Sequence, residues 1–405
     1  MKSWSWLLGC VVLASGLWPT GAAAQSEKQT VLSGLQAEVY GYVKLDASYD
    51  SRRTVAGDLM FFVLPDGPAG RKEEFNMTAR ETRLGLNLGV PGLTDYRVTG
   101  KLETDFYGAG GGDNTALLRM RLAYVNIQKD SLSLMAGQDW DTFITAGPGY
   151  AIIPRIVNFS YMAYAGALGL RRPQVRLTYD KEVADGTRVI AKVAAARTIG
   201  QDIDGDGQND GAAAGFPSGQ GNLILVTDAL GGLKTVLSVS GHGGSERVGA
   251  HMLEGPEGSD PIAVPKKDYD SWSLIGSLSQ QLGSKLTLQG AYWTGENLVT
   301  YWGGIGNGIN RSLRKGVRAQ GGWAQLMLNA TDAVNLNVGY GVDDPNSDDL
   351  NPGSREKNEL LFGSVFYRVN PATTLAVEYS HLTTSYKDGD DAVNNRVQGS
   401  VIFRF

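Results

Sequence analysis

The strongest constraint on the fold is the period-two alternation of residues 394–405, with which the chain ends. One face of this segment carries Val397, Gly399, Val401, Phe403 and Phe405, and the other carries Arg396, Gln398, Ser400, Ile402 and Arg404. Such alternation indicates a strand that meets a different solvent on each side. A soluble sandwich also alternates, but arginines near both ends of a terminal strand favour lipid on one side and water on the other. Because lipid offers no partner to an open sheet edge, the pattern predicts a closed transmembrane β-barrel.

The same alternation recurs along residues 37–405, in about sixteen segments. Most are near the roughly 9–11 residues that a tilted strand needs to cross a membrane. In residues 118–127, for example, Leu122 and Tyr124 are expected to face outward. Every second connection is short and those between are long, as in barrels with short periplasmic turns and long extracellular loops. We therefore expect an all-β, antiparallel up-and-down barrel.

The start of the chain reads as a secretory signal, with Lys2, an apolar run and an alanine-rich cleavage site before residue 25. The expected organisation is a signal peptide at residues 1–24, a short periplasmic lead-in at 25–36 and the barrel at 37–405. The one cysteine, Cys10, lies inside the signal, where a lipoprotein cleavage site is the less favoured alternative. A mean hydropathy of −0.18 argues against a helical membrane protein, and a net charge of −5 against a nucleic-acid partner.

Several segments, in their order and spacing, resemble bacterial outer-membrane porins of the general type, and among these the DcaP-like porins. They read GYVKLDASYD, RETRLGLNL, LRMRLAYVNI, AGQDWDTF and RRPQVRLTYD, followed by the terminal aromatic residue Phe405. The resemblance implies a homotrimeric, sixteen-stranded channel in the Gram-negative outer membrane for small, often anionic solutes. It also implies contact with outer-membrane lipids and recognition of Phe405 by the barrel-assembly machinery. The lead-in is too short for the coiled N-terminal arm of some members, and the third-loop motif of enteric porins is missing.

The longest stretch without alternation, residues 139–169, is rich in aromatic, glycine and small apolar residues. Such a composition is unusual for a solvated loop and fits a loop that packs against a wall. We expect it to fold inward as a constriction, with Asp139, Asp141 and Arg155 facing the pore. The alternative is a loop packed at a subunit interface.

A set of cationic residues falls on the face of the strands that is expected to line the lumen: Arg83, Lys101, Arg119, Arg121, Arg172 and Arg176. Neighbouring guanidinium groups repel one another unless an anion balances them. They either lower the free energy of an anionic solute in the pore or are balanced by lumen carboxylates. The candidate carboxylates are Glu103, Asp105, Asp139 and Asp141. The two interpretations are compatible, since opposed charges would create a transverse field.

An acidic loop matches the first part of a calcium-binding loop, with side-chain oxygens at alternate positions: Asp202, Asp204, Asp206, Gln208 and Asp210. The twelfth position is Ala213, so the bidentate glutamate is missing. Calcium binding is therefore one interpretation, and an acidic solvated loop is the other. No cofactor is expected to be required.

The predicted function is passive diffusion of small hydrophilic solutes, with a preference for carboxylates. The alternatives are a substrate-specific channel with a saturable site, and a plugged structural or adhesive barrel. We do not expect an enzyme. The chain has three histidines and no metal-protease motif, and His242 beside Ser240 and Ser245 is the best catalytic candidate.

Overall fold

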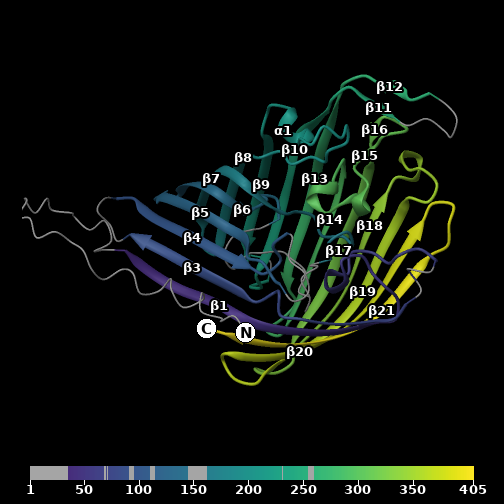
Figure 1. Cartoon of the computed structure of the whole chain (residues 1–405). Helices are drawn as coiled ribbons and strands as arrows, with labels where there is room; N and C mark the ends of the chain where they lie inside the picture. The colour runs from purple at the N-terminus through teal and green to yellow at the C-terminus, as the bar shows by residue number, and fades with distance from the viewer. Residues whose placement is uncertain are drawn as a thin grey trace, which may run out of the picture. The chain divides into compact units, whose positions relative to one another are not determined.

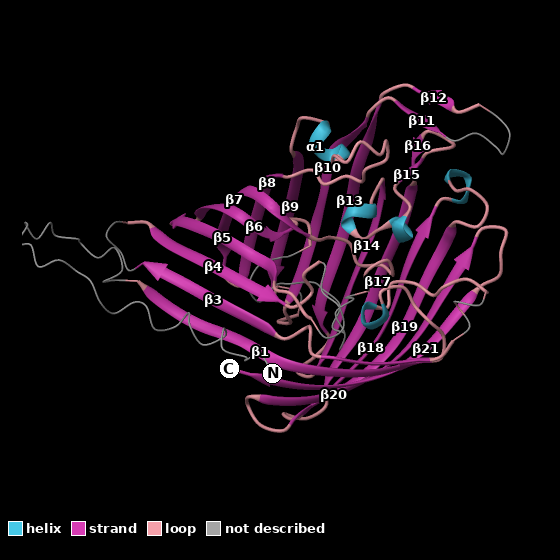
Figure 2. Cartoon of the chain, viewed as in Figure 1, coloured by secondary structure: helices cyan, strands magenta, loops and turns pink. Residues whose placement is uncertain are grey.

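Sixteen antiparallel strands form the closed wall of a barrel, which confirms the predicted fold class and strand number (Figures 1 and 2). The computed structural model describes residues 35–67, 70, 72–90, 95–109, 115–144, 162–229, 231–253 and 260–405. The chain divides into two units, Met1–Leu35 and Gln36–Phe405, and all described strands belong to the second. No helix among the described residues is long and apolar enough to cross a membrane. The wall strands are β1 (Gln36–Asp50), β3 (Arg83–Val90), β4 (Arg97–Asp105), β5 (Arg119–Lys129), β6 (Leu132–Trp140), β7 (Arg171–Ala184), β8 (Thr187–Ala196), β9 (Ser218–Thr227), β10 (Thr235–Val248), β13 (Lys267–Gln281), β14 (Leu286–Glu296), β17 (Arg318–Asn329), β18 (Val334–Pro345), β19 (Arg355–Arg368), β20 (Thr373–Tyr386) and β21 (Ala392–Arg404).

The wall closes on β1, which pairs with three partners. Its first half pairs with β3, and from Tyr42 onward it pairs with β21, the last strand of the chain. A further strand, β2 (Glu74–Thr78), pairs with the end of β1. The first part of β1 is therefore paired with β3 and its last part with β2. The last residue, Phe405, exchanges backbone hydrogen bonds with Gly41 of β1, at N···O distances of 3.1 and 3.2 Å. The two ends of the barrel sequence are thereby joined.

The long connections carry the remaining elements, which lie at one end of the barrel or inside it (Figure 1). They comprise two small hairpins, one α-helical turn and four 3₁₀ turns among the described residues. These are β11 (His251–Leu253) with β12 (Ile262–Val264), β15 (Ile309–Asn310) with β16 (Lys315–Gly316), α1 (Asp210–Ala213), η1 (Gly57–Leu59), η2 (Val299–Tyr301), η3 (Gly304–Gly306) and η4 (Ser347–Asp349).

Alternation along the strands separates a lipid-facing surface from a polar interior. In β21, Val397 and Val401 are 51% and 47% exposed, whereas Arg396 and Gln398 are 1% and 3% exposed. The apolar residues therefore cover the outer surface and the polar residues line the lumen, as the terminal segment predicts.

One strand departs from the predicted alternation. The pairing of β4 with β5 shifts between Glu103 and Thr104, so that β5 contains an extra residue, as in a β-bulge. Arg121 and Leu122 are both buried there, and beyond the bulge it is Val125 and Ile127 that are exposed. The outward placement expected for Leu122 and Tyr124 is therefore wrong, because a bulge reverses the faces of all following residues.

Candidate functional site

The candidate site is the lumen, which three of the long connections enter. The third connection leaves β6, and its described part at residues 162–170 reaches β17, β18 and β19 before returning to β7. There the Nδ2 of Asn358 donates to the carbonyl oxygen of Tyr164 at 2.7 Å. A Cβ at Gly341 would lie 2.1 Å from the carbonyl oxygen of Ala165, and one at Gly166 would lie 2.1 Å from that of Gly322. The loop backbone can approach the wall this closely because these glycines have no side chains. That this loop is the constriction stays a prediction, and Arg155 lies outside the described residues.

The first connection, residues 51–73, also packs on the inner wall. Val63 is fully buried, and its backbone N–H donates to the Oγ1 of Thr384 at 2.9 Å. Arg396 donates to the carbonyl oxygen of Asp58 at 3.0 Å and forms a bidentate pair with Asp50, with both N···O distances at 2.8 Å. From the sequence, this segment was identified only as one of the long connections, and its packing inside the lumen was not predicted.

The connection at residues 297–308 is the third to enter the lumen. Its η2 turn places Tyr301, which is 2% exposed, over the guanidinium of Arg172 at 3.9 Å. The Tyr301 carbonyl oxygen accepts a hydrogen bond from the backbone N–H of Gly169 at 2.6 Å. The side chain of Asp343 on β18 accepts from the backbone N–H groups of Gly304 and Ile305. Sequence reasoning did not single out this connection, although its glycine, aromatic and apolar residues give it the same kind of composition as residues 139–169.

The cationic residues on β3–β5 lie in the lumen, and carboxylates pair with them. Arg121 is 1% exposed and bonds Glu103 and Asp105, each at 2.8 Å. Arg119 forms a bidentate pair with Asp105 at 2.9 and 2.6 Å. Arg83 lies 3.7 Å from Glu103 and over the Tyr42 ring at 5.1 Å. Lys101 lies over the Tyr40 ring at 4.6 Å.

The two predicted arginines of β7 are paired in the same way. Arg172 is fully buried and lies 2.6 Å from Asp141, which also accepts from the backbone N–H of Leu170 at 2.8 Å. Arg176 donates through Nη2 to Asp139 at 2.7 Å, but its Nε and Nη1 atoms are buried and have no hydrogen-bond partner among the described residues. Arg176 is thus bonded to a carboxylate through one nitrogen only.

Sequence reasoning missed one further arginine at this end of β7. Arg171 is 8% exposed, lies over the Trp140 ring at 4.8 Å, and has an Nη1 atom without a hydrogen-bond partner among the described residues. It was missed because strict alternation with Arg172 assigns it to the outer face, where an exposed side chain would be expected.

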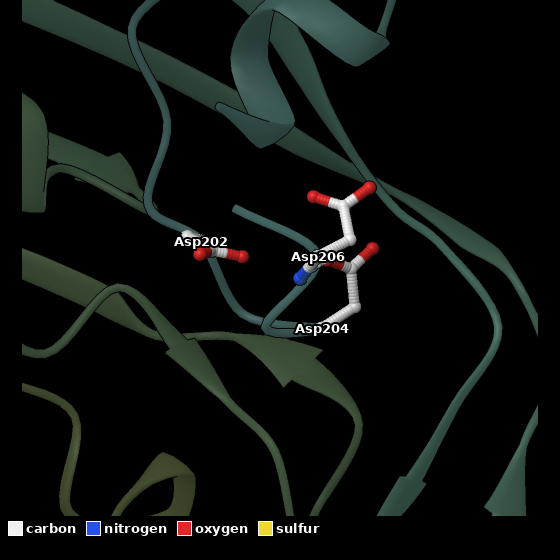
Figure 3. A group of neighbouring side chains, drawn as sticks. All are labelled: Asp202, Asp204 and Asp206. Atoms are coloured by element: carbon white, nitrogen blue, oxygen red, sulfur yellow. Dashed lines mark hydrogen bonds between the residues drawn. The ribbon is translucent and has the colours of Figure 1, made fainter. Parts of the chain in front are cut away.

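The acidic loop brings together three of its five predicted calcium ligands. Carboxylate oxygens of Asp202, Asp204 and Asp206 lie within 4.8 Å of one another on one turn of the loop (Figure 3). Asp210 does not join them, because its carboxylate accepts from the backbone N–H of Ile203 at 2.8 Å. Burial and the nearby carboxylates raise the pKa of Asp210. The side chain of Gln208 is exposed. Calcium binding at this loop stays a prediction.

The catalytic candidate His242 contacts different serines from those expected. Its ring nitrogens lie 2.7 Å from the Oγ of Ser273 and 3.1 Å from the Oγ of Ser271, and its ring lies 4.0 Å from that of Tyr301 between centroids. The ring is 7% exposed and packed between aromatic side chains. These contacts are typical of a buried structural histidine.

Comparison with known proteins shows what this arrangement is similar to. The model of the DcaP outer membrane protein family matches residues 21–211, just under half of the chain. The chain is similar to DcaP-like outer-membrane porins. It is located in the outer membrane of Gram-negative bacteria. No curated protein sequence matches it.

Solved structures show the same fold at low sequence identity. The outer membrane channel DcaP of Acinetobacter baumannii is 18% identical, with a TM-score of 0.71, covering 92% of this porin and 98% of that chain. An anion-selective porin from Comamonas acidovorans is 12% identical, with a TM-score of 0.58 and coverage of 92% and 100%. OmpT of Vibrio cholerae is 13% identical, with a TM-score of 0.53 and coverage of 92% and 98%.

Proposed function

We propose that this porin is a diffusion channel for small hydrophilic solutes that prefers carboxylates and other anions. The observation that carries the proposal is Arg176, which lies on the lumen face of β7, is partly exposed, and is paired with the carboxylate of Asp139 through one nitrogen. A guanidinium charge beside a narrow aqueous lumen is screened less than in bulk water, and it lowers the free energy of a passing carboxylate. On the same strand, Arg171 lies over the Trp140 ring and forms no ion pair among the described residues.

The ion pairs reduce the contribution that the other arginines make to anion selectivity. Arg119 and Arg121 share Glu103 and Asp105, so two positive charges are balanced by two negative charges close by. Such pairs fix the shape of the wall and contribute little to its net potential. The anion-selective porin of Comamonas acidovorans supports the proposal by its similar fold.

The test is the reversal potential of single channels in a planar bilayer under a potassium chloride gradient. We expect wild type to favour chloride, and Arg176→Gln to lower the chloride-to-potassium permeability ratio by about twofold or more, because lumen charges are weakly screened. Arg188→Gln is the matched control, since Arg188 belongs to the adjoining strand and is held by Asp180.

A wild type that strongly favours potassium would refute the proposal, as would an Arg176→Gln variant that behaves like wild type. Block of the current by one dicarboxylate at low concentration would favour a saturable, substrate-specific channel. A barrel without conductance would favour the plugged alternative.

The proposed assembly is a homotrimer in contact with outer-membrane lipids. One similar structure, OmpT of Vibrio cholerae, is described in a trimer form, with 12% identity and a TM-score of 0.53. Chemical crosslinking of the folded porin in detergent should yield a trimer, and a monomer alone would contradict this assembly.

A further inference from the structure

A continuous groove runs along the outer, lipid-facing side of the wall, across β9 to β19. It has three sections, with volumes of about 720, 480 and 540 Å³ in order from the membrane interior to the extracellular rim. Tyr292 and Ala324 line both the first and the second section, and Gln320 and Lys357 line both the second and the third. The third section also contains Asn346, in the long connection after β18, and so lies at the extracellular end. The groove therefore leads from the extracellular rim into the membrane-facing wall.

The first section is apolar, and small residues form its floor. Gly276, Gly290 and Ala324 lie on the neighbouring strands β13, β14 and β17, beside Leu237 and Val239 of β10. A Cβ at Gly276 would have no atom within 4 Å apart from its chain neighbours, so the space above this glycine is open. An unfilled groove forfeits the dispersion contacts that packed atoms make. An apolar chain lying in this section restores them.

The third section carries cationic side chains that are accessible from outside. Those of Arg318 and Lys357 are 55% and 41% exposed. Arg318 and Lys315 both pair with the buried Asp349, so two positive charges share one carboxylate. Lys357 lies 3.3 Å from Glu359. Ion pairs this exposed contribute little, so an anionic ligand can compete for the lysine.

Two carboxylates lie in the same section without an ion pair among the described residues. They belong to Asp344, which accepts a hydrogen bond from Gln320 at 3.3 Å, and to Glu356. Phosphate groups bind cationic side chains directly, and they bind carboxylates through a shared divalent cation. The mixture of accessible cations and carboxylates therefore fits a headgroup that carries phosphates together with divalent cations.

The second section lies at the height where lipid tails give way to headgroups. Tyr292 and Tyr340 line it, and their hydroxyl groups donate to Gln320 and Glu359. Tyrosines with an apolar ring and a hydrogen-bonded hydroxyl are typical of this boundary in membrane proteins. The groove thus changes from apolar to charged at the height where an amphiphilic lipid does.

We propose that the groove binds lipid A, the phosphorylated and multiply acylated part of lipopolysaccharide. Its phosphates contact the third section, and one of its acyl chains lies in the first. The extracellular leaflet of the Gram-negative outer membrane is built from this lipid, and the groove opens toward that leaflet. The inference concerns the outer wall and does not depend on the anion preference of the lumen.

The experiment is native mass spectrometry of the mature porin, refolded in detergent without lipid and then mixed with purified lipid A and magnesium chloride. We expect wild type to bind lipid A, and the affinity of Gly276→Leu to be lower by about fivefold or more, because the new side chain fills the groove. Gly399→Leu is the matched control and should retain the wild-type affinity. Gly399 lies outside the groove in β21, and a Cβ there would also have no atom within 4 Å apart from its chain neighbours.

The charged section is tested separately. Lys357→Gln removes a cation and should lower the affinity by about threefold or more. Its control is Lys285→Gln, because Lys285 is an exposed lysine beside the short turn before β14, at the opposite rim. A chelator added to wild type should also weaken binding, because Asp344 and Glu356 then lose the cations that join them to phosphate.

Equal affinities of Gly276→Leu and Gly399→Leu would overturn the proposal, as would binding that neither Lys357→Gln nor the chelator weakens. Phosphatidylethanolamine that binds wild type as tightly as lipid A would also overturn it. A trimer that forms in Gly399→Leu but not in Gly276→Leu would assign the groove to a second copy of the chain instead. A folded band for each variant on unheated gels excludes misfolding as the cause of lost binding.

Discussion

At the scale of single residues, position relative to a carboxylate decides what each arginine does. Arg121 and Arg172 are both buried and paired. Removing Asp141 would leave the Arg172 charge buried and uncompensated, which typically costs about 3–5 kcal/mol. Arg176 is paired through one nitrogen only and is partly exposed. The same residue type thus serves the stability of the wall in one place and the proposed selectivity in another.

A residue-scale prediction concerns Asp349 of η4, outside the membrane-spanning strands. Burial opposes its ionisation, but hydrogen bonds from Arg318 and Lys315 outweigh that effect and hold its pKa well below the usual range. Its carboxylate accepts from the Arg318 backbone N–H at 3.1 Å. The stabilisation is therefore present above the ordinary aspartate pKa and is lost as the pH falls through the lowered value. Asp349→Asn should remove about 1–2 kcal/mol of local stability.

Hydrogen exchange of the peptide containing Arg318 measures this loss, as exchange about five to thirty times faster at neutral pH, since 1.4 kcal/mol is a factor of ten. Asp348→Asn is the matched control, because Asp348 is exposed and adjacent. Equal exchange in both variants would show that Asp349 does not hold this loop.

At the scale of elements, the inner faces of β17 and β18 are a glycine-lined platform for the third loop. Gly341 in β18 has its would-be Cβ 2.1 Å from the Ala165 carbonyl oxygen and 2.3 Å from the Met162 methyl carbon. The position of the loop therefore depends on the absence of a side chain on the opposite wall. A substitution there acts on the pore without touching any charged residue.

Gly341→Ala should push residues 162–170 away from the wall and toward the middle of the lumen. Overpacking of this kind costs about 1–3 kcal/mol. We expect a lower single-channel conductance than in wild type, measured in planar bilayers. Gly363→Ala in the neighbouring strand β19 is the control, since its added Cβ would have only one neighbour within 4 Å, at 3.9 Å. Equal conductance in the two variants would show that Gly341 does not set the position of the third loop.

Strand alternation and loop lengths could be predicted from the sequence because both are local and repeat along the chain. The path of the loops inside the lumen could not, because it opposes local preference. Among the described residues, seven of the ten that have positive φ without being glycine lie in the three loops that enter the lumen. They are Ala56, Met60, Met162, Tyr164, Asn297, Trp302 and Ile305. Apart from Asn297, which tolerates this conformation, each costs about 1–2 kcal/mol and persists only because tertiary packing holds it. The ion pairs of Arg119 and Arg121 likewise depend on register and on a bulge that no periodicity reveals.

At the scale of the whole molecule, closure rests on the contact between the two ends of the wall. Asp46 of β1 accepts hydrogen bonds from Gln398 and Ser400 of β21, and Asp50 pairs with Arg396. Phe405 adds the last pair of backbone hydrogen bonds, to Gly41. The seam is therefore joined by polar side chains inside and by the backbone ladder within the wall.

Deleting Phe405 removes two of these backbone hydrogen bonds and the terminal aromatic residue that we expect the assembly machinery to recognise. The amount of folded porin in outer-membrane fractions should fall severalfold, as judged by heat-modifiable migration on gels. Phe403→Leu is the control, because Phe403 also faces outward but is not terminal. Undiminished folded porin after the deletion would contradict the role of Phe405.

The seam also sets a condition on biogenesis. Ser400 and Asp46 are separated by 354 residues, and closing a chain segment of that length costs about 5 kcal/mol of chain entropy. Any nascent or truncated chain that ends before β21 has two unpaired edges, which are prone to aggregation. Every earlier strand can be complete while the product is still unusable. Only the presence of β21 turns fifteen paired strands into a closed wall, so completeness of the chain and closure of the barrel are one condition.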